Sequence, residues 1–90
     1  MNKEDLVDQV ADRTGQTKKQ TMAVVDAVFA SITGTLRRGE KVTVVGFGTF
    51  QVRGRAARDG RNPRTGVKIR IPPKRVPVFT PGKDLKAEVG

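Results

Sequence analysis

The sequence predicts an α+β fold: two N-terminal helices, a three-stranded antiparallel sheet with a long protruding β-ribbon arm, and a short C-terminal helix. Three observations predict it. Apolar residues recur at helical spacing as far as Leu36, and from Val42 onward they alternate with polar residues as in strands. Residues 53–75 are polar and basic, with a turn signal at Gly60-Arg61-Asn62-Pro63. This stretch is typical of a two-stranded ribbon that extends from a small body.

The first helix is expected over residues 3–14, where the apolar positions share one face. Asn2 is a suitable N-cap, and the acidic residues of the first turn favour the positive end of the helix dipole. Gly15 suits the position that ends a helix. The apolar positions are Leu6, Val7, Val10 and Ala11.

The second helix is expected to begin near Lys18, because Thr17 and Gln20 match a capping box. The helix is expected to end at Gly39. An apolar face of this kind needs a surface to pack against. Its stripe, widened by Val24 and Val28, consists of Met22, Val25, Phe29, Ile32 and Leu36.

Period-two alternation predicts one strand at residues 42–44 and a second at residues 50–52. Gly46-Phe47-Gly48 lies between them as a tight connection, in which the glycines allow positive φ and Phe47 turns inward. Near the C-terminus, Thr80 is expected to cap a short helix whose first position is taken by Pro81.

Composition and charge point to an oligomer with a polyanionic partner. The 90 residues include four Phe and no Trp or Tyr, so one chain has little large apolar volume for a core, and a symmetric dimer is expected. The net charge of +9 is concentrated in residues 51–90, which hold 11 Lys and Arg against 3 Asp and Glu. A surface of that sign attracts nucleic acid or anionic lipid. A membrane-surface role is disfavoured, because the basic region is β-patterned and not an amphipathic helix.

The residue inventory disfavours catalysis. The sequence has no His, Cys or Tyr and no Gly-rich phosphate-binding loop, so neither a catalytic residue nor a metal site nor a cofactor is expected. The absence of Cys fits a reducing cytoplasm. No signal peptide or spanning segment is recognisable, and a cytoplasmic location is therefore expected.

Three motifs carry a resemblance to a known family: Val45-Gly46-Phe47-Gly48-Thr49-Phe50, Gly60-Arg61-Asn62-Pro63 and Phe79-Thr80-Pro81-Gly82-Lys83. Together they resemble the HU and integration host factor family of histone-like bacterial proteins, over essentially the whole chain. Within the family, the minimal length and the Arg-rich segment after Phe50 resemble the HU branch. The resemblance implies an intertwined dimer with a helical base, saddle-forming sheets, and arms that wrap the DNA minor groove. It also implies that Pro63 is a wedge that inserts between base pairs.

The resemblance makes the chain a single DNA-binding domain over residues 1–90. Residues 1–40 are then the helical dimerisation base, residues 41–80 the sheet and DNA-binding arm, and residues 81–90 the C-terminal helix. The four aromatic residues are expected in the dimer core and not as stacking platforms for bases: Phe29, Phe47, Phe50 and Phe79.

Basic residues of the arm are the candidate DNA contacts. Arg53 and Arg55 lie two apart, as do Lys68 and Arg70 on the returning strand, so these four cations are expected to line one ribbon face. Two lysines on the terminal helix are expected as secondary contacts. The complete expected set is Arg53, Arg55, Arg58, Arg61, Asn62, Pro63, Arg64, Lys68, Arg70, Lys83 and Lys86.

The function expected is that of a nucleoid protein that binds double-stranded DNA with little sequence specificity and bends, wraps and compacts it. Bent, nicked or gapped DNA is the expected preferred form. The alternative is a site-specific architectural protein of the integration host factor type. An RNA-binding or ribosomal protein is a further rival, since composition does not separate the two kinds of basic binder, and RNA is expected as a secondary ligand. Homodimer and heterodimer with a paralogue both stay open.

Overall fold

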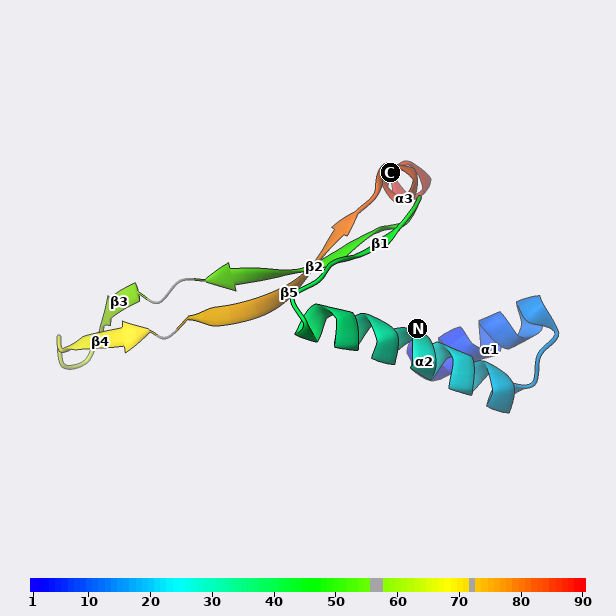
Figure 1. Cartoon of the computed structure of the whole chain (residues 1–90), viewed down its shortest axis with the longest axis horizontal. Helices are drawn as coiled ribbons and strands as arrows, with labels where there is room; N and C mark the ends of the chain where they lie inside the picture. The colour runs from blue at the N-terminus through cyan, green and yellow to red at the C-terminus, as the bar shows by residue number, and fades with distance from the viewer. Residues whose placement is uncertain (56–57, 72) are drawn as a thin grey trace. The chain divides into compact units, whose positions relative to one another are not determined.

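The structure is a computed structural model that describes residues 1–55, 58–71 and 73–90. It confirms the α+β class and the predicted order of helices and strands (Figure 1). The chain forms two compact units, Met1–Gly34 and Thr35–Gly90. Among the described residues, no helix has the length and apolar character needed to cross a bilayer. The elements are α1 (Lys3–Thr14), α2 (Lys18–Arg37), β1 (Val42–Val44), β2 (Gly48–Arg55), β3 (Arg58–Arg61), β4 (Lys68–Ile71), β5 (Lys74–Pro81) and α3 (Lys83–Val89).

The predicted ends of α1 are confirmed. The Oδ1 atom of Asn2 accepts the Asp5 N–H at 2.9 Å, and Oδ2 of Asp5 accepts the Asn2 N–H at 3.2 Å. This reciprocal pair satisfies two backbone donors that the first turn leaves without helical partners. Gly15 follows the helix with a φ of 69°, a left-handed conformation that glycine adopts without strain.

The predicted ends of α2 are also confirmed. Oγ1 of Thr17 accepts the Gln20 N–H at 3.1 Å, while Oε1 of Gln20 accepts the Thr17 N–H at 3.2 Å, which forms the expected capping box. At the other end, Gly39 has a φ of 79°. Its N–H donates to the Leu36 carbonyl at 2.9 Å, so the chain leaves the helix there.

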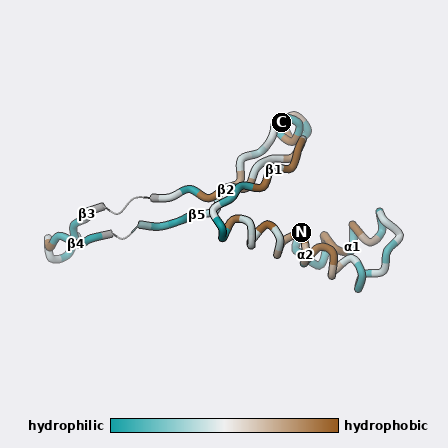
Figure 2. Tube along the Cα trace, viewed as in Figure 1, coloured by the Kyte–Doolittle hydropathy of each residue, from teal (hydrophilic) through white to brown (hydrophobic). Residues whose placement is uncertain are grey.

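The helical face is less buried than its periodicity predicts. Among the described hydrophobic residues only Val7, Ala11 and Val25 are buried, whereas Val24 is 62% and Phe29 47% exposed. Brown, hydrophobic positions recur along α2 (Figure 2). A single pair of short helices has too little surface to cover this stripe, so one chain leaves apolar area in contact with water.

Three strands of the second unit form an antiparallel sheet in the order β1-β2-β5. Phe50 of β2 pairs with Val42 on one side and with Phe79 on the other. The remaining strands, β3 and β4, pair antiparallel in a separate two-stranded sheet. The predicted arm is therefore built from two paired segments, the ends of β2 and β5 and the β3–β4 pair that lies between these strands in the sequence.

The connection between β1 and β2 is a tight turn, as expected, but its two glycines have different roles. The Phe47 N–H donates to the Val44 carbonyl at 2.9 Å, and Gly46 has a φ of 82°. Gly48, which was expected to share the positive φ, does not, because it pairs with Val44 and Pro81 in the sheet. A Cβ atom at Gly48 would lie 2.6 Å from the Phe79 ring, so close packing excludes a side chain there.

The expected cap of the C-terminal helix is wrong. Thr80 pairs with Thr49 and Pro81 with Gly48, so both belong to β5. The helix begins at Lys83 with Gly82 as its N-cap and with no side-chain hydrogen bond at the cap. The β2–β5 ladder continues through Thr80 and Pro81, which leaves neither residue available to start the helix.

Gly48→Ala is expected to destabilise the protein by about 1–3 kcal/mol, because the new methyl group overpacks against the Phe79 ring and the Thr80 carbonyl. Gly54→Ala is the matched control, since no atom lies within 4 Å of a Cβ built at Gly54 in the same strand. Chemical denaturation of both variants checks this. Equal stabilities would show that the sheet has room at Gly48.

Candidate nucleic-acid interface

The paired strands β3 and β4, with the loop that joins them, form the ribbon, defined here as residues 58–71. Asp59 pairs with Arg70 and Arg61 with Lys68. Directly paired residues of antiparallel strands lie on the same face, and alternate residues share that face. One face of the ribbon therefore carries three cations and one carboxylate.

The carboxylate is Asp59, which forms an ion pair with Arg70 at 3.8 Å. Both side chains are more than two-thirds exposed, so the pair contributes little to stability. Its effect is to lower the net positive charge of that face. Strand alternation puts Asp59 and Arg61 on one face, but it does not show which residue of the returning strand pairs with Asp59. In the described part of the chain, no three or more His, Cys, Asp or Glu residues lie close enough together to hold a metal ion.

The tip of the ribbon is the loop at residues 62–67. The Asn62 N–H donates to the Val67 carbonyl at 2.8 Å, and the Gly66 N–H donates to the Asn62 carbonyl at 2.8 Å. Gly66 has a φ of 70°. The turn expected at Gly60-Arg61-Asn62-Pro63 is thus shifted toward the C-terminus, because Gly60 and Arg61 stay paired in β3 and the chain reverses only where Gly66 allows positive φ.

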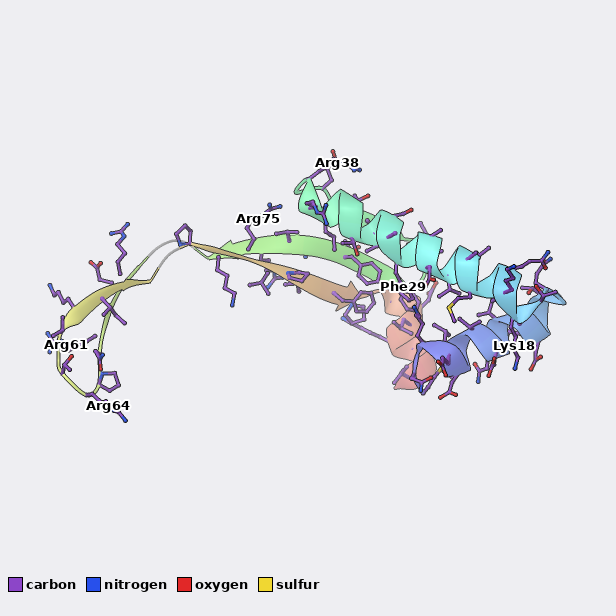
Figure 3. The ribbon with its side chains drawn as sticks, turned by 90° about the horizontal axis from the view of Figure 1, so that it is seen from below. Lys18, Phe29, Arg38, Arg61, Arg64 and Arg75 are labelled. Atoms are coloured by element: carbon purple, nitrogen blue, oxygen red, sulfur yellow. The ribbon has the colours of Figure 1, made fainter. Side chains whose placement is uncertain are left out.

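Three residues of the expected binding set are exposed around this loop. Pro63 and Arg64 lie in the turn itself, and Arg61 ends β3. Figure 3 shows Arg61 and Arg64 at the end of the ribbon with side chains that point away from it. The tip therefore presents an apolar ring between cationic side chains, which can meet both sugars and phosphates.

The four cations that were expected to line one ribbon face belong to two different sheets. Arg53 pairs with Val76 and Arg55 with Lys74, both in the β2–β5 ladder. Lys68 and Arg70 lie instead in the separate β3–β4 sheet, so they are not cross-strand neighbours of the β2 arginines. The side chains of Arg55 and Arg58 lie outside the described residues.

Lys74 is a candidate site residue that sequence analysis missed. It is exposed and stands opposite Arg55 in the β2–β5 register. The sequence pattern could have indicated Lys74, because it lies an even number of residues from Lys68 and Arg70, as residues on one face of a strand do. Lys74 therefore joins the candidate basic surface.

Arg75, the next basic residue, has a different role. Its guanidinium donates to the carbonyl oxygens of Leu36 and Arg37, at 3.2 and 3.3 Å. These carbonyls lie at the C-terminal end of α2, where helical partners are lacking and the helix dipole is negative. Arg75 is labelled on the sheet in Figure 3. Arg75 thus stabilises the junction of helix and sheet.

The two lysines expected as secondary contacts, Lys83 and Lys86, are exposed on α3.

Three of the four phenylalanines form a cluster: Phe79 lies 4.8 Å from Phe50 and 5.5 Å from Phe47, measured between ring centroids. Phe47 is 46% and Phe79 38% exposed, so the cluster is incompletely covered in one chain.

Phe29 belongs to the first unit, whereas the other three phenylalanines belong to the second. It lines a shallow hollow together with Met1 and Leu6 and is 47% exposed. The first unit by itself therefore leaves Phe29 about half exposed.

Comparison with known proteins places this geometry in a family. The family described as "Bacterial DNA-binding protein" matches residues 1–90. The chain is 55% identical over 89 residues to the DNA-binding protein HU of Geobacillus stearothermophilus, and equally to that of Staphylococcus aureus, with 99% of each chain covered. It is similar to the protein in an Anabaena HU-DNA cocrystal structure, with a TM-score of 0.87, 49% identity, and 99% and 97% of the two chains covered. HU from Thermotoga maritima matches with a TM-score of 0.73 and 37% identity over both full chains. The chain belongs to the bacterial DNA-binding protein family, among relatives named HU.

Proposed function

We propose that this protein is a histone-like architectural protein that binds double-stranded DNA in the minor groove with little sequence specificity, and that bends, wraps and compacts it without catalysis. The observation that carries the proposal is the basic two-stranded ribbon that ends in an exposed proline. Membership of a family of DNA-binding proteins supports it. A location in the cytoplasm, on the nucleoid, follows from this partner.

The cations of the ribbon and of the adjoining strands bind phosphates in this proposal. Arg61, Arg64 and Lys68 are exposed on the ribbon, and the sheet contributes Arg53 and Lys74. Each neutralised phosphate releases condensed counterions, which gives affinity without sequence information. The rest of the proposed contact set is Arg55, Arg58, Pro63, Arg70, Lys83 and Lys86.

The minor groove accounts for low specificity. Its hydrogen-bond pattern is nearly the same for A·T and T·A pairs, so donors such as Arg61 and Arg64 bind there without selecting one sequence. A relative named HU was solved with DNA, and the curated relatives carry the same name. These similarities favour the HU type of function over the site-specific integration host factor type. RNA is proposed only as a secondary ligand.

Pro63 is the proposed wedge. It is exposed at the end of the ribbon, has a rigid ring, and lacks the N–H that would have to be hydrated. Apolar side chains inserted at a base step unstack it, at a cost of about a few kcal/mol, and bend the duplex so that more protein surface meets DNA. DNA that is already bent, nicked or gapped avoids part of this cost and binds more tightly in the proposal.

The functional form is proposed to be a dimer. The side chains of Val28, Phe29 and Phe47 are about half exposed in the single chain, and other large hydrophobic side chains, such as Val24 and Val44, are exposed as well. A second copy covers such area by symmetry, with residues 1–40 as the dimerisation base. We propose a homodimer, with a paralogous chain as the other candidate partner. Residues 41–80 then form the sheet and arm, and residues 81–90 the terminal helix.

Titration of unrelated duplexes is expected to give nearly equal affinities, with nicked DNA bound more tightly and matched RNA more weakly. The logarithm of the association constant should fall with the logarithm of salt concentration by about 0.9 per neutralised phosphate. Gel shifts at several salt concentrations and fluorescence transfer between duplex ends measure these quantities. A decisive preference for one sequence would favour the integration host factor type, and a preference for RNA would refute the DNA proposal.

Pro63→Ala is expected to reduce the bend of intact duplexes markedly while it lowers affinity by less than about tenfold, because the wedge is lost and the phosphate contacts stay. Arg64→Ala is the contrasting variant. It should lower the salt slope by about 1 and keep the bend at saturating protein. Fluorescence transfer on end-labelled duplexes checks both, and an unchanged bend with Pro63→Ala would exclude wedging.

Sedimentation equilibrium at micromolar concentration is expected to give twice the chain mass of 9.8 kDa. Phe29→Ala should then destabilise the dimer by about 3–5 kcal/mol, the usual cost of truncating a fully buried Phe. The midpoint of thermal unfolding should also rise with protein concentration, because folding and association are coupled. A folded monomer whose stability is independent of concentration would contradict the dimer.

A further inference from the structure

Asn62 makes a side-chain hydrogen bond within the tip of the ribbon. Its Oδ1 accepts the Arg64 N–H at 2.9 Å, two residues along the chain. This geometry is an Asx turn, in which a side chain takes the place of a backbone carbonyl in a tight turn. The residue enclosed by the turn is Pro63.

The Asx turn restricts the direction of the Pro63 ring. The ring already fixes φ of Pro63 near −65°, which leaves ψ as its soft backbone angle. The bond from the Arg64 N–H to Asn62 limits that angle, because rotation about it would carry the N–H away from Oδ1. The same hydrogen bond closes a ring of atoms that also contains ψ of Asn62, the angle that sets the direction of the proline ring relative to β3. The proline ring therefore has one preferred direction before any ligand is present.

The backbone of Asn62 is anchored on both sides. Its N–H donates to Val67 and its carbonyl accepts the Gly66 N–H, each at 2.8 Å. Asn62 is only partly exposed, whereas Pro63 and Arg64 are exposed. Asn62 thus joins the end of the strand pairing to the proline and differs from its neighbours, which face solvent.

We propose that Asn62 is a positioning residue, whose hydrogen bond to the Arg64 N–H orients Pro63 for insertion and lowers the ordering cost of bending DNA. It was expected among the direct DNA contacts, and this proposal assigns it a role through Pro63. The inference rests on the proposed function of Pro63 as a wedge. A base-reading role would require the side chain to leave the turn.

Asn62→Ala and Asn62→Ser separate the two roles. Ala removes the acceptor, while the Ser hydroxyl can form the corresponding turn more weakly. Thr65→Ala is the matched control, because it removes the other side-chain acceptor of the loop, which bonds the Val67 N–H at 3.3 Å. Hydrogen exchange of the Arg64 amide in the DNA-free protein monitors the turn. Fluorescence transfer and gel shifts on intact and nicked duplexes monitor bending and affinity.

Asn62→Ala is expected to speed exchange of the Arg64 amide and to weaken binding to intact duplex about fivefold, the factor that corresponds to about 1 kcal/mol for one lost hydrogen bond. The bend of intact duplex should fall with it. Binding to nicked duplex should change less than about twofold, because the kink there costs less. Asn62→Ser should recover part of each loss, and Thr65→Ala should bend DNA normally.

Two results would overturn the positioning role while the proposed function stands. One is a normal bend by Asn62→Ala despite faster exchange of the Arg64 amide. The other is an equal loss of affinity for intact and nicked duplexes without recovery by Ser, which would indicate direct contact. Failure of the unsubstituted protein to bend DNA would overturn the proposed function and the positioning role together.

Discussion

The antiparallel pairing of β2 with β5 is the interaction on which the second unit, Thr35–Gly90, depends. It runs from the Gly48–Pro81 pair to the Arg55–Lys74 pair, so residues distant in sequence are held in one register. The same register places Phe50 opposite Phe79, where the aromatic cluster forms. Because the strands are antiparallel, the chain between them must turn back on itself, and that reversal is the ribbon.

A limited supply of apolar residues constrains the rest of the molecule. The sheet of one chain covers only part of its aromatic cluster, and the helices leave Val24 and Phe29 largely open to water. Burial of such side chains is the main source of folding free energy, so a chain of this size gains much from a second copy. The small core also explains why close packing at Gly48 matters, since few other contacts can compensate for a shift of Phe79.

The basic residues of the second half have different roles, although composition presents them as one group. Arg75 completes the end of a helix, and Arg70 is paired with Asp59. Arg61 and Arg64 project from the tip of the ribbon. A count of positive charges therefore overstates the number of cations with no protein partner.

The features of this fold that could be predicted from the sequence are those that depend on interactions within a few residues. Asn2, Thr17 and Gly15 mark the helix ends correctly, because caps depend on hydrogen bonds within a few residues. The basic arm and its turn were also recognisable, since alternation and turn residues are local features. The position of the turn was not, because it depends on how far the β3–β4 pairing extends before Gly66 permits a reversal.

By itself, the sequence determined the class of fold, the boundaries of the two N-terminal helices and the basic character of the arm, all of which depend on residue type and spacing. Only the tertiary structure decided which cations lie opposite one another, that Thr80 continues a strand, and that Arg75 caps a distant helix. These outcomes depend on strand register. Register is set by pairing across long stretches of chain, and a shift of one residue would exchange the two faces of a strand.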